Sequence, residues 1–196
     1  MTKKGFTLIE LLVVIAILAI LMAVVVIAIN PAEMLKKTRD TKRISDLDAL
    51  RTALNLYITD QGNLGSLVST NCYLHSIDTF SGTDISPTCN FVASTSQAVN
   101  GGGWIPIDFS VISSGNPLST LPVDPNPKAT GGVDQGGWHA YIFRADGVSA
   151  GFKLLANMES KYYSYNSTPP TGQGDVESKD GGNLLGVYEI GSNMGL

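Results

Sequence analysis

The feature that most constrains this chain is an uninterrupted apolar run of nineteen residues near its N-terminus, Leu11–Ile29. As an α-helix the run spans about 28 Å, close to the roughly 30 Å hydrocarbon thickness of a bilayer. It is apolar on every face, which excludes an amphipathic surface helix. It is also too long for a cleaved secretory signal, and no small-residue cleavage site follows it. The run predicts a membrane-spanning helix, either an ordinary anchor or one processed on its N-terminal side.

Glu10 directly precedes this run, where a carboxylate is costly. Insertion scales give about 2.5–3.5 kcal/mol for a charge at the bilayer centre and less near a helix end. An ordinary anchor gains nothing from such a residue. The acid therefore either reaches the headgroups from the helix end or has a specific cationic partner.

The residues before Glu10 favour a cationic partner. The stretch KKGFTLIE, with Lys3, Lys4, Gly5 and Phe6 ahead of the acid, resembles the processing site of type IV prepilins and pseudopilins. The resemblance implies that a prepilin peptidase/methyltransferase cuts after Gly5 and methylates the new amine of Phe6. It also implies a homo-oligomeric helical filament, built by a membrane platform and an assembly ATPase.

In such a filament Glu10 is expected to pair with the Phe6 amine of a neighbouring subunit. Within one helix the i, i+4 spacing would also let Glu10 meet its own Phe6 amine. A buried ion pair adds little net stability, but it can specify the register of packed helices. Glu10 is therefore interpreted as an assembly residue.

Charge is divided unevenly along the chain. Residues 1–43 have a net charge of +4, and residues 44–196 have a net charge of −8. The acidic majority and a pI near 5.0 argue against nucleic acid as the main partner. Five of the cations form a basic neck: Lys36, Lys37, Arg39, Lys42 and Arg43. We expect the basic neck to be a solvated helix face, to contact lipid phosphates, or to pair with acids of neighbouring subunits.

Asn30 and Pro31 predict a break in the helix. The residue before a proline avoids the α region, whereas Asn30 suits an N-cap and Pro31 suits the first helical position. A second helix is expected from Pro31 to about Thr59. Its apolar stripe begins only after the basic neck and comprises Leu47, Leu50, Leu54, Tyr57 and Ile58.

The chain thus divides into a leader (1–5), a transmembrane and assembly helix (6–29), the second half of the long helix (30–60) and a globular head (61–196). The head begins with a long loop containing short elements, followed by a hairpin turning at Asp146–Gly147 and a last strand at 186–191. This order predicts an α+β fold in which an antiparallel sheet covers the helix stripe. It also resembles the pilin-like fold, a long N-terminal α-helix packed on a small β-sheet head.

Cys72 and Cys89 are the only cysteines. Behind a membrane segment, in an exported head, they favour a disulfide over two reduced thiols.

A Gly-rich stretch near the C-terminus supplies four oxygen-bearing residues: Asp175, Glu177, Asp180 and Asn183. These could hold a structural Ca²⁺, as in some pseudopilins, although the spacing is not that of an EF-hand. A solvated acidic loop is the alternative, and no other cofactor is expected.

The sequence contains no nucleophile elbow, zinc motif or phosphate loop, so we predict that the protein is not an enzyme. His75 and His139 are expected to be surface or loop residues. Trp104 and Trp138 are expected to pack in the core or at its rim.

The resemblance implies a single-pass protein of the inner (cytoplasmic) membrane with a cytoplasmic N-terminus and an exported head. After assembly it would lie in a cell-surface pilus or a periplasmic pseudopilus. The count of flanking cations alone favours the opposite orientation. Two alternatives to a pilin stay open: a major pseudopilin of type II secretion, and a membrane-tethered binding domain that never polymerises. A third possibility, a minor pilin for DNA uptake, is disfavoured by the acidic head.

Overall fold

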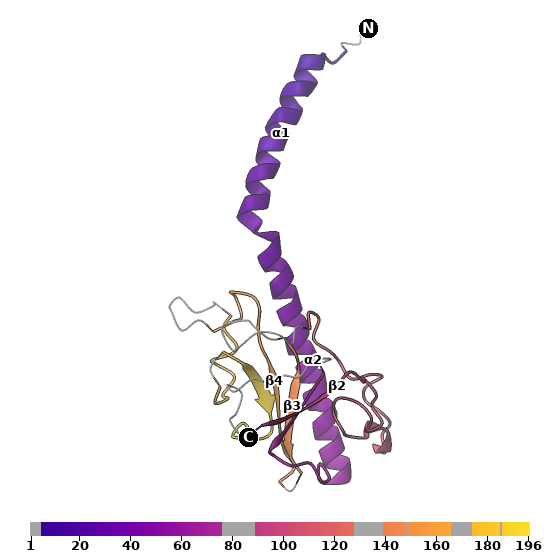
Figure 1. Cartoon of the computed structure of the whole chain (residues 1–196). Helices are drawn as coiled ribbons and strands as arrows, with labels where there is room; N and C mark the ends of the chain where they lie inside the picture. The colour runs from indigo at the N-terminus through magenta and orange to yellow at the C-terminus, as the bar shows by residue number, and fades with distance from the viewer. Residues whose placement is uncertain (1–4, 76–88, 128–138, 148, 166–173, 185) are drawn as a thin grey trace.

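The computed structural model describes residues 5–75, 89–127, 139–147, 149–165, 174–184 and 186–196. Helix α1 (Leu8–Ile29) is followed at once by helix α2 (Pro31–Gln61). Figure 1 shows the two helices as one long stalk, with the head gathered around the far part of α2. Among the described residues, one helical stretch, Leu8–Val26, is long and apolar enough to cross a membrane.

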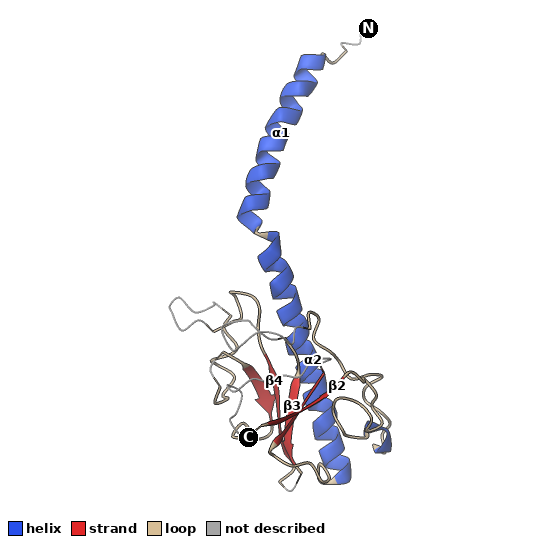
Figure 2. Cartoon of the chain, in the orientation of Figure 1, coloured by secondary structure: helices blue, strands red, loops and turns tan. Residues whose placement is uncertain are grey.

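The predicted break at Asn30–Pro31 is confirmed. Asn30 has φ 46° and ψ 78°, in the left-handed region that asparagine tolerates better than most residues. It ends α1 and caps α2, because its Oδ1 accepts the Glu33 N–H at 3.4 Å. Figure 2 shows the interruption as a short non-helical link in the stalk. The second helix then runs two residues beyond the predicted end, to Gln61.

The head is built on a five-stranded sheet with the order β2-β1-β3-β4-β5. The strands are β1 (Asn71–His75), β2 (Asn90–Ser94), β3 (Ile142–Asp146), β4 (Gly151–Ala156) and β5 (Tyr188–Gly191). The predicted hairpin is β3–β4, and β5 lies within the predicted last strand. β1 and β2 pair in parallel, inside the segment that the sequence predicts to be a long loop with short elements. All other neighbours are antiparallel, which gives an α+β, pilin-like architecture.

One face of the sheet packs on α2. Phe143 of β3 and Phe152 and Leu154 of β4 are fully buried against the helix residues Leu47 and Leu50. The predicted helix stripe is therefore confirmed, with its last residues, Tyr57 and Ile58, only partly buried at the edge of the core. Because side chains alternate along a strand, the intervening residues of β3 and β4 point to the opposite face.

Trp104, from the loop between β2 and β3, closes the core beside α2 and is 1 % exposed. Its indole N–H donates to the Pro122 carbonyl oxygen at 3.1 Å, so its polar atom is satisfied. The predicted core role of Trp104 is confirmed, whereas Trp138 lies outside the described residues.

The opposite face of the sheet has a smaller apolar cluster around Cys72, Leu74, Ile142 and Leu155. The predicted disulfide is present there and joins Cys72 of β1 to Cys89, just before β2, with a Cα–Cα distance of 5.7 Å. The bridge therefore ties together the two strands of the parallel pair.

Within the basic neck, Arg43 is fully buried and so does not belong to a solvated face, whereas Lys37 and Lys42 are exposed. Arg43 Nε and Nη2 donate to the two carboxylate oxygens of Asp124 at 2.7 and 2.8 Å. Nη1 donates to Asp40 at 2.7 Å, and Nη2 also reaches Glu159 at 2.5 Å. Burial by itself lowers the pKa of the Arg43 guanidinium, but the bonds to Asp124 and Glu159 outweigh it and hold that pKa above its usual range. Arg43 therefore stays charged inside the head.

Two further residues of the basic neck are also paired within the chain. Arg39 donates to both oxygens of Glu159, at 3.0 and 2.6 Å. Burial raises the pKa of Glu159, but the bonds from Arg39 and Arg43 outweigh it and lower that pKa to about 2. Lys42 pairs with Asp46 one turn along the helix. The expectation that the neck is solvated or pairs with other subunits is wrong for Arg39 and Arg43, since acids of their own head hold them.

Replacing Arg43 is expected to weaken the whole head. Arg43→Met would leave Asp40, Asp124 and Glu159 short of a buried partner, and breaking a buried pair costs about 3–5 kcal/mol. Urea unfolding of the full chain in detergent micelles, followed by tryptophan fluorescence, measures the loss. Arg51→Met is the matched control, because the Arg51–Asp48 pair is about half exposed and such pairs contribute roughly 0–1 kcal/mol. Equal losses in the two variants would contradict a structural role for the buried cluster.

Candidate assembly site at the N-terminal end of the stalk

The first turn of α1 is closed by a capping box. Thr7 is the N-cap, and its Oγ1 accepts the Glu10 N–H at 3.3 Å. In return, Glu10 Oε2 accepts the Thr7 N–H at 2.8 Å and the Thr7 hydroxyl at 2.7 Å. The box satisfies backbone donors that a helix N-terminus otherwise leaves free, and the carboxylate lies where the helix dipole favours negative charge.

This capping box is not among the features predicted from the sequence, although its signature can be read in the letters TLIE. A Thr followed three residues later by Glu, just before an apolar run, marks a helix N-terminus. Glu10 thus has a hydrogen-bond partner, Thr7, in its own chain. The cost of placing a carboxylate near lipid predicts only that some partner exists, not that it is Thr7. Both hydrogen bonds that the Glu10 carboxylate accepts from Thr7 end on Oε2. Among the described residues, Oε1 of Glu10 accepts no hydrogen bond.

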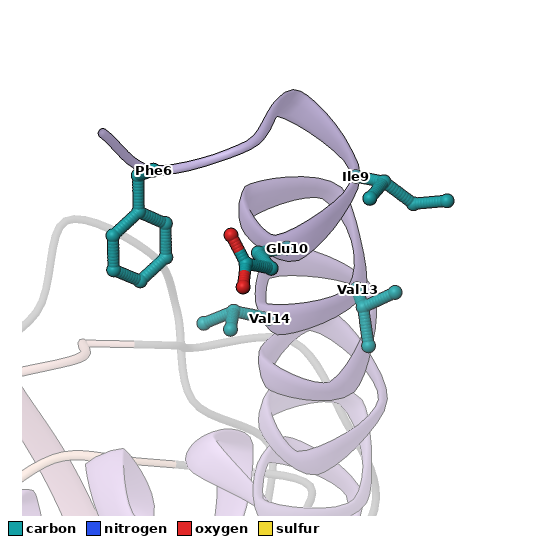
Figure 3. Close-up of a pocket in the computed structure, with 5 residues that line it drawn as sticks. All are labelled: Phe6, Ile9, Glu10, Val13 and Val14. Carbon is teal, nitrogen blue, oxygen red and sulfur yellow. The ribbon is translucent and has the colours of Figure 1, made fainter. Parts of the chain in front are cut away.

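Glu10 also lines a shallow apolar depression of about 380 Å³, together with Phe6, Ile9, Val13 and Val14. Figure 3 shows Phe6, Glu10 and Val14 on the same side of the helix end. Phe6 is 82 % exposed, and Gly5 before it is exposed and non-helical. The peptide bond between Gly5 and Phe6 therefore lies outside the helix, where a protease can bind it in an extended form.

Beyond this depression, α1 presents apolar surface on all sides. The residues of its candidate membrane span are all unburied, and Figure 1 shows the helix projecting away from the head. Soluble monomers rarely expose apolar patches beyond a few hundred Å². Either lipid or other apolar helices must therefore cover α1.

The structure does not gather the four predicted calcium ligands, Asp175, Glu177, Asp180 and Asn183, around one point. Glu177 and Asp180 each accept two backbone N–H groups, from different segments. The side-chain oxygen of Asn183 accepts from the ammonium of Lys153 at 2.8 Å. Within the described residues no group of three or more His, Cys, Asp or Glu is placed to hold a metal ion. Calcium binding stays a prediction.

The two histidines lie apart from the depression at Glu10. His75 ends strand β1 and is partly buried, whereas His139 is 6 % exposed and precedes β3. His139 thus lies in the connection before β3, within the expectation of a surface or loop residue, but it is buried rather than at the surface.

Glu177 is 2 % exposed and holds the loop before Tyr165 in place. Its carboxylate accepts the N–H groups of Met158 at 2.8 Å and Tyr165 at 2.6 Å. Burial raises the pKa of Glu177 to about 7; the two N–H groups oppose this rise, and the nearby Asp40 and Asp175 carboxylates reinforce it.

The raised pKa of Glu177 predicts that the head loses stability as the pH rises. In the folded state Glu177 binds its proton more tightly than in the unfolded chain, where its pKa is about 4.3. The stabilising contribution is complete below that value and is lost as the pH rises through about 7. The free energy of unfolding of the wild type should therefore be lower at about pH 8 than at about pH 5. Glu177→Gln should lack this contribution to the pH dependence.

Urea unfolding across this pH range measures the difference. Asp48→Asn, at a half-exposed position on α2, is the control and should keep the wild-type pH dependence. A Glu177→Gln curve parallel to the wild type would refute the assignment to Glu177.

Fold and site together define a membrane-anchored α+β protein whose apolar stalk begins with a capped acidic turn. The family model of the prokaryotic N-terminal methylation motif matches residues 1–26. The chain therefore carries, at its N-terminus, the class III signal found in type IV pilins and pseudopilins. The motif implies processing by a prepilin peptidase. Neither curated proteins nor solved structures gave a match to the chain.

Proposed function

We propose that this protein is the subunit of a type IV pilin-like filament. A prepilin peptidase cuts it after Gly5 and methylates Phe6, and the α1 helices of many copies then pack into the core of a fibre. The observation that carries this proposal is an apolar helix exposed along its whole candidate span, with Glu10 as its single ionisable residue. Lipid covers this helix before assembly, and neighbouring copies of α1 replace the lipid in the fibre.

The charge balance at the helix end supports the role of Glu10. Cleavage after Gly5 creates an α-ammonium on Phe6, next to the depression that Glu10 lines. Thr7 occupies Oε2 of Glu10, so Oε1 can accept the amine of an adjacent copy while the capping box stays closed. In the low-dielectric core of a fibre, an unpaired ammonium or carboxylate would be costly, and pairing the two fixes how far one helix slides along the next.

We place the fibre at the cell surface. The Cys72–Cys89 disulfide suits a head that works in an oxidising environment, and the long connection between β2 and β3 suits a displayed surface. A periplasmic pseudopilus of a type II secretion system is the alternative within the same class. Electron microscopy of material sheared from cells separates the two, since surface fibres are recovered only in the first case.

Processing is tested on the mature protein itself. Mass spectrometry of the N-terminal peptide from membranes or sheared fibres should find a chain that begins with N-methyl-Phe6, because the exposed Gly5–Phe6 bond precedes the helix. A working protein that still begins at Met1 would exclude the processing route.

The role of Glu10 in assembly is separated from its role in capping by two variants. Glu10→Gln keeps a capping side chain but removes the charge, and fibres should fall about tenfold or more, since ~1.4 kcal/mol per contact is tenfold in association. Thr7→Ala removes the N-cap side chain, at a helix cost of about 0.5–2 kcal/mol, but leaves the charge. We expect Thr7→Ala to retain most fibres. The readout is the amount of sheared fibre relative to membrane-bound protein.

Asp48→Asn is the control for these variants, because it removes a carboxylate from the half-exposed part of α2 and should assemble normally. Normal fibres from Glu10→Gln would refute the proposed ion pair. A protein that stays functional but never forms fibres would instead identify a membrane-tethered binding domain.

A further inference from the structure

The sheet face that points away from α2 contains a buried lysine with two close partners. Lys153, in the middle of β4, is 1 % exposed. Its Nζ lies 2.7 Å from Glu189 Oε1 and 2.8 Å from Asn183 Oδ1. Glu189, on β5, is also 1 % exposed. Because Leu155 pairs with Glu189 and Lys153 pairs with Gly191, the lysine and the acid are diagonal neighbours on one face.

The turn that carries Asn183 is held firmly around Glu189. Glu189 Oε2 accepts the Leu184 N–H at 2.8 Å, and the Glu189 N–H donates to Asp180 at 2.6 Å. A Cβ on Gly182 would lie 1.7 Å from Glu189 Oε2, so the turn approaches the carboxylate as closely as a backbone without a side chain permits. Asp180 before Asn183 and Leu184 after it are therefore both hydrogen-bonded to Glu189. These bonds keep the side-chain amide of Asn183 against Lys153.

A lysine amine, an asparagine side-chain amide and a buried carboxyl group are together the reactants and the proton carrier of an amide exchange. Cγ of Asn183 lies one C=O bond, about 1.23 Å, beyond the oxygen that Lys153 contacts. A rotation of the amide then brings Nζ and Cγ to the roughly 3–3.5 Å of a reactive approach. We propose that Lys153 and Asn183 form an intramolecular isopeptide crosslink, with Glu189 as the group that transfers the proton.

The reaction is balanced without any further reagent. Glu189 takes a proton from Nζ along their hydrogen bond, which gives a neutral amine that can attack Cγ. The Nζ–Cγ bond forms and the Cγ–Nδ2 bond breaks. Glu189 delivers its proton to Nδ2 and takes the second proton from Nζ. Nδ2 leaves as ammonia through the exposed position of Asn183 and carries that second proton away as ammonium. The product is a secondary amide between the two side chains, and nothing is oxidised or reduced.

This crosslink would close the chain from residue 153 to residue 183 into a covalent ring. It would fasten the turn before β5 to the middle of β4, at the end of the sheet opposite the Cys72–Cys89 bridge. Both ends of the sheet would then resist unfolding when the head is pulled relative to its stalk. The inference stands on the geometry of the head alone and is independent of the filament proposal.

Intact-mass measurement of the purified full chain, reduced at its disulfide, tests the proposal directly. We expect the wild type to be lighter than its mature sequence by one ammonia, in part or all of the molecules. Trypsin does not cut at an acylated lysine, so digestion should leave 145–161 uncut at Lys153 and joined to 180–196 as a branched peptide. A digest that contains only separate peptides with unmodified Lys153 and Asn183 and no branched peptide, or an ammonia loss located at another residue, would overturn the crosslink.

Variants then identify the roles of the three residues. Glu189→Gln keeps the size of the side chain but removes the proton carrier, and Lys153→Arg removes the nucleophile, so both should have the full mass. Lys179→Met, which removes an exposed lysine from the same segment, is the matched control and should still lose ammonia. A Glu189→Gln chain that crosslinks as completely as the wild type would refute the role given to Glu189.

Discussion

The buried guanidinium of Arg43 is the interaction on which the arrangement of stalk and head depends. It projects from α2 and bonds to Asp124 in one loop of the head and Glu159 in another. Asp40, on the same helix face, accepts the N–H groups of Glu159 and Ser160 at 2.9 and 2.7 Å. A charge buried in this way is tolerated only when each of its donors is paired, so the two loops and the helix hold one another in place.

Pairing with acidic residues of the head also explains how the chain can have a basic neck beside a membrane helix. Counted as free charges, the neck cations oppose the orientation that the processing motif implies. In the folded chain Arg39 and Arg43 are paired with acids of the head, and Lys37 lies over the ring of Tyr162 at 3.6 Å. Part of the basic neck therefore lies at the contact between α2 and the head, where Arg39 and Arg43 pair with acidic residues from later in the chain.

Several elements were predictable because their cause is local. Asn30–Pro31 breaks the helix through backbone sterics, the Leu47–Leu50–Leu54 spacing forms one helix face, and the strands around Asp146–Gly147 alternate toward a core. The paired cysteines were also predicted. Other features depend on partners far along the chain. The pairing of β1 with β2, the burial of Arg43 beside Asp124, and the contact of Lys153 with Glu189 join residues whose neighbours in the sequence carry no signal of the meeting.

The sequence by itself determined that this chain has an apolar helix of membrane-spanning length behind a prepilin-type processing motif, because a run of bilayer length and the residues that precede it are local features. It also determined where the helix breaks and where the main hairpin turns. Only the tertiary structure decided which charges are buried. Burial depends on segments that are distant in the sequence and pack around a residue. It is what distinguishes the buried, paired charges of Arg43 and Lys153 from the solvent-exposed charges of the chain.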